Sequence, residues 1–201
     1  NTVALIYNNY QNPISAESSK EEMEEIAKIA IENNLWVLAD DAYYEIKYDG
    51  KSRSIVEIPE MRDRTVILYT FSKKYAMTGW RVGGSIGPEK IIKIISKLNV
   101  NAESCTTHFI QDAMVEALNG DQSGPNEILR RLKKRRDVAV SGLNAIDGIE
   151  ISTPESTFYL FPKVNEILKR KAFESVENLQ LGALKNANVS FCTRDHFGRP
   201  Q

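Results

Sequence analysis

The residues with the clearest chemical potential lie in one short stretch, where a lysine follows a hydroxyl-rich turn. Lys73 comes after Thr70 and Ser72, and Arg81 stands eight positions later. A lysine amine forms a Schiff base with an aldehyde, while hydroxyls and a planar guanidinium bind a phosphate. An aldehyde that also carries a phosphate is pyridoxal 5'-phosphate, and the stretch fits a site for it. Taken alone, a solvated Ser-Lys-Lys turn explains it equally well.

A second stretch places two acids and two tyrosines directly after the apolar run 35–39. Pyridoxal phosphate withdraws electrons well only while its ring nitrogen is protonated, and a neighbouring carboxylate keeps the proton there. Asp40 is the candidate for this role. Tyr43 follows three residues later and is placed to offer its phenol to the ring oxygen of the cofactor.

A third polar turn follows the apolar run 3–6 and contains Asn12 and Pro13. The Asn12 amide can hydrogen-bond the ring oxygen of the cofactor or a substrate carboxylate, and Pro13 stiffens the turn. Taken alone, this motif is better explained by an ordinary Asn-Pro turn without a ligand.

Together the three motifs resemble the class I and II aminotransferases of fold type I. That family shows, in this order, an Asn-Pro-x-Asn-Pro-Thr-Gly loop, an Asp-x-x-Tyr motif, and a Ser-x-Ser-Lys motif followed by Gly-x-Arg. The resemblance makes Lys73 the Schiff-base lysine, Asp40 the partner of the pyridine nitrogen and Tyr43 the partner of the ring oxygen. It also makes Asn12 the second asparagine of the loop, and it makes Thr70, Ser72 and Arg81 the phosphate ligands.

The resemblance continues through residues 111–113 and 156–162, and it has one clear departure. Pro13-Ile14-Ser15 stands where the family has Pro-Thr-Gly, and Tyr10 replaces the first loop proline. In the family, a glycine-bearing phosphate turn precedes the Asn12 loop, and a substrate-carboxylate arginine follows the region of Cys192. We therefore expect the chain to correspond to the central and C-terminal part of an aminotransferase and to bind the cofactor weakly by itself.

The resemblance implies transfer of an amino group between an amino acid and a 2-oxo acid, in a homodimer when the protein is complete. Lys73 would then also act as general base and acid on the substrate. The same residues serve a C–S lyase or an aminocyclopropane-carboxylate synthase. They also serve a sensor domain that binds the cofactor without turnover. The motifs leave these alternatives open.

The elements that must position these residues alternate between strands and helices. Apolar runs at 3–6, 35–39 and 65–70 predict strands, the last of a kind buried on both faces of a parallel sheet. A capping box at 19–22 predicts a helix up to about residue 32. A further strand at 82–87 and helices at 89–98 and 107–118 follow. This order predicts an α/β fold, which the resemblance specifies as a three-layer αβα sheet.

The strongest break in the chain is the Gly- and Pro-containing segment 119–125. We expect residues 1–124 to form part of a large cofactor-binding domain, 125–146 an interdomain helix starting near Asn126, and 147–201 an incomplete small α+β domain. In the small domain, the pattern predicts strands at 149–152, 157–161 and 189–192 and a helix at 175–186.

Composition argues against several classes of function. The 26 basic and 27 acidic residues give a net charge of −1, which favours neither nucleic acid nor a membrane surface. The basic run 130–136 lacks interleaved aromatic residues, so a solvated helix face is the better interpretation. The two cysteines and two histidines lack metal-ligand spacing. Without a signal peptide or a run of about twenty apolar residues, we expect a cytoplasmic protein with reduced thiols.

Overall fold

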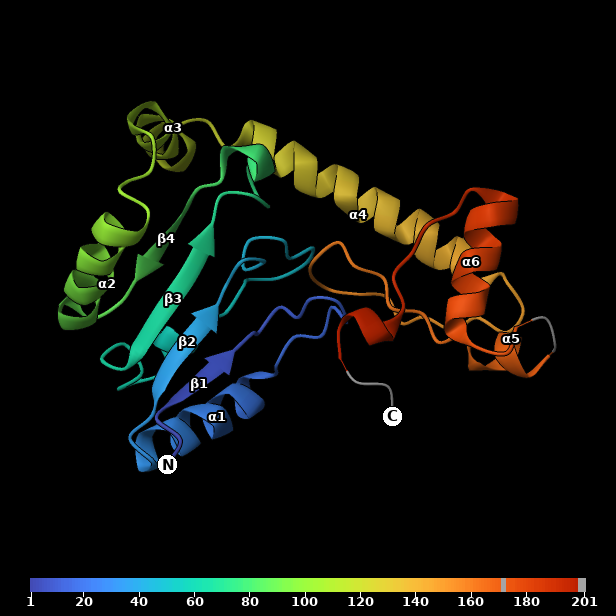
Figure 1. Cartoon of the computed structure of the whole chain (residues 1–201), viewed down its shortest axis with the longest axis horizontal. Helices are drawn as coiled ribbons and strands as arrows, with labels where there is room; N and C mark the ends of the chain where they lie inside the picture. Colours follow the sequence, from blue (N-terminus) through green and yellow to red (C-terminus); the bar gives the residue numbers. More distant parts are fainter. Residues whose placement is uncertain (171–172, 199–201) are drawn as a thin grey trace.

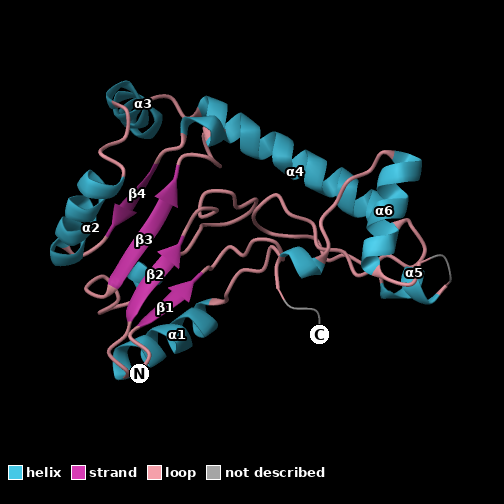
Figure 2. Cartoon of the chain, in the orientation of Figure 1, coloured by secondary structure: helices cyan, strands magenta, loops and turns pink. Residues whose placement is uncertain are grey.

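The structure, a computed structural model, describes residues 1–170 and 173–198 and is organised around a four-stranded sheet (Figures 1 and 2). Strands β1 (Ala4–Tyr7), β2 (Trp36–Asp40) and β3 (Thr65–Thr70) run parallel, and β4 (Gly83–Ile86) pairs antiparallel with β3. Because parallel strands end at the same edge of a sheet, the residues that follow β1, β2 and β3 meet there. The alternating α/β pattern predicted from the sequence is confirmed.

Helix α1 (Lys20–Glu32) covers one face of β1 and β2. The Ser19 side chain accepts from the Glu22 amide, and the Glu22 carboxylate accepts from the Ser19 amide, so the predicted capping box is confirmed. One side of the helix is buried against alternate strand residues, in a cluster that includes Met23, Ala27, Ala30, Val37 and Ala39. Burial of this apolar stripe holds the helix on the sheet.

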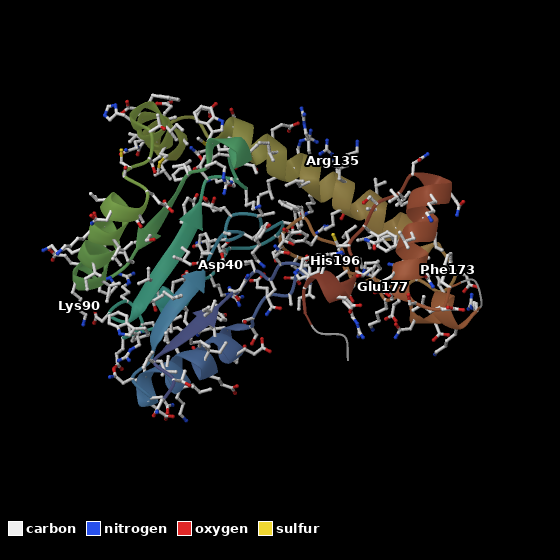
Figure 3. The ribbon with its side chains drawn as sticks, viewed as in Figure 1. Asp40, Lys90, Arg135, Phe173, Glu177 and His196 are labelled. Carbon is white, nitrogen blue, oxygen red and sulfur yellow. The ribbon has the colours of Figure 1, made fainter. Side chains whose placement is uncertain are left out.

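Two further helices follow β4. Helix α2 (Glu89–Ala102) begins with a turn that contains Lys90, which is labelled in Figure 3. The Lys90 Nζ lies 5.1 Å from the centroid of the Trp36 ring. Helix α3 (His108–Asn119) packs Ala113 and Met114 against the cluster around Phe71. Ile67 packs against the cluster of α1 and Tyr69 against that of α3, so these two helices contact the same face of β3. The contact between Lys90 and Trp36 is made at the other face of the sheet.

Strand β3 departs from its prediction, because it is not buried on both faces. Leu68 is 39% exposed, and Ile6 of β1 is 75% exposed. Asp40 is opposite Leu68 in the parallel register, and Ile6 is opposite Leu38, so the exposed residues share the face of Asp40. Within the described part of the chain, α1 covers only the other face of these strands.

The long helix α4 (Ser123–Asn144) runs from the sheet to a smaller region with α5 (Asn165–Lys169) and α6 (Val176–Ala187) (Figure 1). It begins at Ser123, three residues before the predicted start. The Asp121 carboxylate accepts from the Ser123 amide, and Pro125 fits the first turn of a helix, where no amide donor is needed. Short 3-10 turns lie at Ile55–Glu57, Thr78–Trp80 and Arg194–His196.

The basic run on α4 forms ion pairs along the helix and with one loop. Arg130 and Arg131 both pair with Glu127, at 2.6 and 2.7 Å. Lys133 pairs with Asp49 at 2.6 Å. These contacts are typical of a solvated helix face.

The three strands predicted beyond residue 147 are wrong. The segment 149–152 contains one isolated bridge, between Glu150 and Lys163, and the segments 157–161 and 189–192 contain neither a strand nor a bridge. In these segments side chains, rather than a neighbouring strand, form hydrogen bonds with the backbone amides and carbonyls. The Asn144 amide group bonds both the amide and the carbonyl of Ile151, and the Gln180 side chain donates to the Phe191 carbonyl. The predicted helix at 175–186 is confirmed as α6, one residue later.

No helix in residues 1–170 and 173–198 has the length and apolar character needed to cross a membrane.

Candidate active site

The ends of β2 and β3 place an acid and a hydroxyl on the same face of the sheet. Asp40 is opposite Leu68 in the parallel register, and Thr70 follows two residues after Leu68, so all three share one face. Figure 3 shows Asp40 at the carboxyl end of β2. The Asp40 carboxylate is half-buried and accepts from the Ala42 amide at 3.3 Å. Asp40 therefore lies where parallel sheets bind ligands.

The Lys73 side chain reaches back across the sheet edge toward the residues after β2. Its ammonium nitrogen lies 5.2 Å from the centroid of the Tyr43 ring and 5.7 Å from that of Phe158. Lys73 forms no ion pair with any carboxylate of the described residues. The next lysine behaves differently, because Lys74 pairs with Glu45 at 2.5 Å and this contact raises its pKa against the opposing effect of burial. Of the two amines, only that of Lys73 is free of a carboxylate partner.

Tyr43 connects Lys73 with a distant segment of the chain. Its ring is buried, and its hydroxyl lies 2.5 Å from the hydroxyl of Tyr159. Burial, the hydrogen bond to Tyr159 and the charge of Asp40 all raise the pKa of Tyr43. The Tyr43 phenol therefore stays protonated and able to donate a hydrogen bond at physiological pH.

The three residues expected to hold a phosphate lie in one turn between β3 and β4. The Thr70 hydroxyl accepts from the Ser72 amide at 3.1 Å, and the Thr78 hydroxyl donates to the Ser72 carbonyl at 3.2 Å. The Arg81 guanidinium donates to the Thr78 carbonyl at 2.9 Å and is otherwise exposed. The turn thus brings Thr70, Ser72 and Arg81 into one hydrogen-bonded unit. Arg81 is exposed in it, whereas Ser72 is buried and the Thr70 hydroxyl donates to the Val82 carbonyl at 3.4 Å.

Asn12 differs from the other candidates, because no hydrogen bond or ion pair joins its side chain to any of them. Its side chain is exposed, and its loop reaches the site indirectly. The connection runs through Ser15, whose hydroxyl donates to the Tyr159 carbonyl at 2.8 Å. The loop is therefore fixed to the segment that contacts Tyr43, while Asn12 itself contacts none of the other candidates.

Asp41 lies outside the site, although it follows Asp40 directly. It is buried on the other face of the sheet, lines a cavity of about 500 Å³ and accepts from the Ser54 hydroxyl at 2.9 Å. Burial raises the pKa of Asp41 to about 6, and the Ser54 hydrogen bond opposes this shift. Nearby Asp40 and Glu57 raise the pKa further.

Sequence reasoning gave no role to Ser15, Phe158 or Tyr159, all of which reach the site. The segment 156–162 was noted only as a continuation of the resemblance. Phe158 and Tyr159 approach Tyr43 with ring centroids 5.4 Å away in each case. Their one signal in the sequence is an aromatic pair inside that segment, and a contact across 116 positions leaves no local spacing to find.

Comparison with known proteins places this geometry in a family. The model of the family "Aminotransferase class I and II" matches residues 1–194. The chain belongs to the class I and II aminotransferases. It is 35% identical over 201 residues to an aspartate aminotransferase of Bacillus sp. (strain YM-2), covering 99% of this chain and 51% of that protein. It is 34% identical over 202 residues to aromatic-amino-acid aminotransferase 2 of Thermococcus litoralis, covering 98% and 50%.

Solved structures agree with this assignment. The crystal structure of the aspartate aminotransferase from Rhizobium meliloti matches with a TM-score of 0.89 and 32% identity, over 98% of this chain and 51% of that chain. The aromatic aminotransferase from Pyrococcus horikoshii OT3 matches equally well, with a TM-score of 0.89 and 32% identity over 98% of this chain and 52% of that one. The fold is therefore that of the family, and the chain spans about half the length of these relatives.

Class I and II aminotransferases use pyridoxal phosphate, and the residues of this site fit it. The Lys73 amine is free of carboxylate partners among the described residues and lies against aromatic rings. The donor set of the turn, two hydroxyls and a guanidinium, suits a phosphate. The acid at the end of β2 and the protonated phenol of Tyr43 complete the polar groups that the cofactor ring requires.

Proposed function

We propose that the protein containing this chain transfers an amino group between an amino acid and a 2-oxo acid with pyridoxal phosphate. The observation that carries the proposal is the placement of the Lys73 amine against Tyr43 and Phe158, at the sheet edge that holds Asp40. The names of the relatives support the same reaction class, since they include aspartate and aromatic-amino-acid aminotransferases.

In this proposal each residue has a separate task. Thr70, Ser72 and Arg81 hold the phosphate, and Lys73 holds the aldehyde end of the cofactor. The Asp40 carboxylate keeps a proton on the ring nitrogen by charge pairing. When bound, the cofactor supplies an electron sink for the bond that breaks at the substrate Cα.

With the cofactor bound, proton transfer would fall to the Lys73 amine. Its nitrogen would take the proton from the substrate Cα as general base and would donate that proton, as general acid, to the cofactor carbon that had carried the aldehyde. The neighbouring rings of Tyr43 and Phe158 keep water from one side of this nitrogen, and they limit its motion. The Tyr43 phenol donates to the ring oxygen of the cofactor, and Asn12 serves as a second donor from its loop.

The proposal extends to a homodimer in the cytoplasm. Apolar side chains on α2 and α3, such as Leu98 and Phe109, are exposed. Their exposure supports the view that another part of the complete protein or a second subunit covers this surface. The exposed free thiols of Cys105 and Cys192 suit a reducing compartment. Sedimentation of the complete protein tests the dimer, and a monomer at micromolar concentration would contradict it.

An assay of the protein at its full natural length tests the reaction. Purified enzyme with cofactor is given a panel of amino acids with and without a 2-oxo acid, and new amino acid, new oxo acid and free ammonia are measured. Transamination predicts that product formation needs the 2-oxo acid acceptor and releases no ammonia. Ammonia release without an acceptor would indicate a lyase, and cofactor binding without any product would indicate a sensor. Either result would overturn the proposal.

A further inference from the structure

Two residues beside the site have unusual backbone conformations and contact each other directly. Ser15 and Thr157 have φ angles of 57° and 58°, in the left-handed region, and both are buried. Their hydroxyl oxygens lie 2.6 Å apart, although 142 positions separate the residues. Side chains with a Cβ carry a cost of about 1 kcal/mol or more in this region, so surrounding contacts must hold them there.

The contacts around this pair close into a ring of hydrogen bonds. The Tyr159 amide donates to the Thr157 hydroxyl at 3.1 Å, and the Ser15 hydroxyl donates to the Tyr159 carbonyl at 2.8 Å. Since the Ser15 proton is used on that carbonyl, the Thr157 hydroxyl must donate to Ser15. Both the amide and the carbonyl of Tyr159 are therefore bonded to the Ser15–Thr157 pair.

The same segment is fixed from a second side. The Thr157 amide donates to the Ile46 carbonyl at 2.8 Å, and the Tyr48 hydroxyl donates to the Thr157 carbonyl. Ile46 and Tyr48 follow Tyr43 closely in the chain. The backbone of Tyr159 is thus held at a set distance from the residues that carry Tyr43.

We propose that Tyr159 is a positioning residue for Tyr43, and that the Ser15–Thr157 hydroxyl pair is the latch that holds it. The Tyr159 hydroxyl lies 2.5 Å from the Tyr43 hydroxyl. Because the backbone of Tyr159 is fixed, this hydrogen bond also fixes the position of the Tyr43 phenol. The inference rests on the proposed function, in which that phenol contacts the cofactor. Ser15 also stands where the family pattern has glycine, which would accept the φ angle but could not form the latch.

The first test uses the cofactor-free enzyme at full natural length and measures the Tyr43–Tyr159 contact directly. Unfolding equilibria are compared for Tyr43→Phe, Tyr159→Phe and the double variant, with Tyr44→Phe in place of Tyr43→Phe as the matched control. The pair is expected to be coupled by about threefold to tenfold in the unfolding equilibrium constant, the scale of one hydrogen bond. Coupling no larger than in the Tyr44 control would overturn the inference.

The second test measures positioning through the absorbance of the bound cofactor during a pH titration. Charged groups facing Tyr43 are Asp40 and Lys73, and both are kept in every variant. Tyr159→Phe is expected to move the titration midpoint by about half a unit to one unit. In the Tyr43→Phe background, Tyr159→Phe is expected to move it no further. An equal shift in both backgrounds would overturn the positioning role.

The latch is tested with Ser15→Gly, which relieves the backbone and removes the hydroxyl, and with Thr157→Val. Both are expected to shift the midpoint in the same direction as Tyr159→Phe, while Thr157→Ser restores the natural value. Unshifted midpoints in Ser15→Gly and Thr157→Val would overturn the latch. A third outcome is coupling in the first test together with an unchanged midpoint in Tyr43→Phe. It would show that the Tyr43 phenol does not contact the cofactor, and the positioning role of Tyr159 would then be wrong as well. A lack of coupling alone would leave the proposed function standing.

Discussion

Asp40 and Asp41 are adjacent in the chain, yet their carboxylates lie on opposite faces of the sheet. Asp40 shares the face of Leu68 and Thr70, whereas Asp41 lines the cavity beside Ile67 and Tyr69. The alternation of a strand produces this separation, because successive side chains point to opposite faces. Of the two acids, only Asp40 is therefore placed to pair with the cofactor in the proposed site, where Lys73 and Thr70 would hold it.

The first prediction compares these two acids in the enzyme at full natural length. Asp40→Asn should fold normally and lower kcat by about 100-fold or more, the scale on which one electrostatic group acts in a catalytic site. Asp41→Asn should change kcat by less than about threefold, since it touches Ser54 rather than the site. Equal losses in the two variants would mean that the wrong acid has been assigned to the ring nitrogen.

The second prediction concerns Asp41 and the pH dependence of stability. Burial raises the pKa of Asp41 to about 6 from 3.8, so the folded state binds this proton more tightly than the unfolded state. Its contribution to stability is therefore complete below about pH 4 and is lost as the pH rises through about 6.

Asp41→Asn mimics the protonated form and removes this loss. Relative to the natural protein, its free energy of unfolding should improve by about 3 kcal/mol between pH 4 and pH 7. Denaturant unfolding at both pH values measures the change. A constant difference between the two proteins would show that the pKa of Asp41 is not raised in the folded state.

The third prediction uses a matched pair of glycines in β4. A Cβ at Gly83 would lie 2.5 Å from the Tyr69 carbonyl oxygen, whereas a Cβ at Gly84 would meet nothing within 4 Å. Gly83→Ala should therefore destabilise the protein by about 1–3 kcal/mol and disturb the turn that presents Thr70 and Arg81. Gly84→Ala should stay within about 0.5 kcal/mol of the natural protein. Similar unfolding midpoints for the two variants would contradict the close approach of β4 to β3.

Much of the fold could be predicted because its signals are local. The capping box at Ser19 and Glu22, and the apolar runs of β1, β2 and β3, specify elements through spacing alone. The register that places Asp40 opposite Leu68 follows from strands that end at one sheet edge. Beyond residue 147 the prediction of strands failed, because Asn144 and Gln180 bond backbone groups that a ladder would otherwise use.

The site could be predicted only where its residues belong to compact motifs. Asp40 ends β2, and Tyr43 and Lys73 each stand three residues after a strand. The structure brings Lys73 to Tyr43, as that order implies. Tyr159 and Ser15 join through contacts across more than a hundred positions, which spacing does not encode. From the sequence, Lys73 could be chosen over Lys74 as the cofactor lysine only by matching the family motif. In the structure the two differ because Lys74 forms an ion pair with Glu45.

That difference between neighbouring lysines gives the most direct test of the central claim. The enzyme at full natural length is loaded with pyridoxal phosphate, reduced with borohydride, digested and mapped by mass spectrometry. We predict that the fixed cofactor is found on Lys73, that Lys74→Ala is labelled as fully as the natural protein, and that Lys73→Ala is not labelled. Labelling of Lys74 alone, or of lysines scattered over the surface, would contradict the site described here.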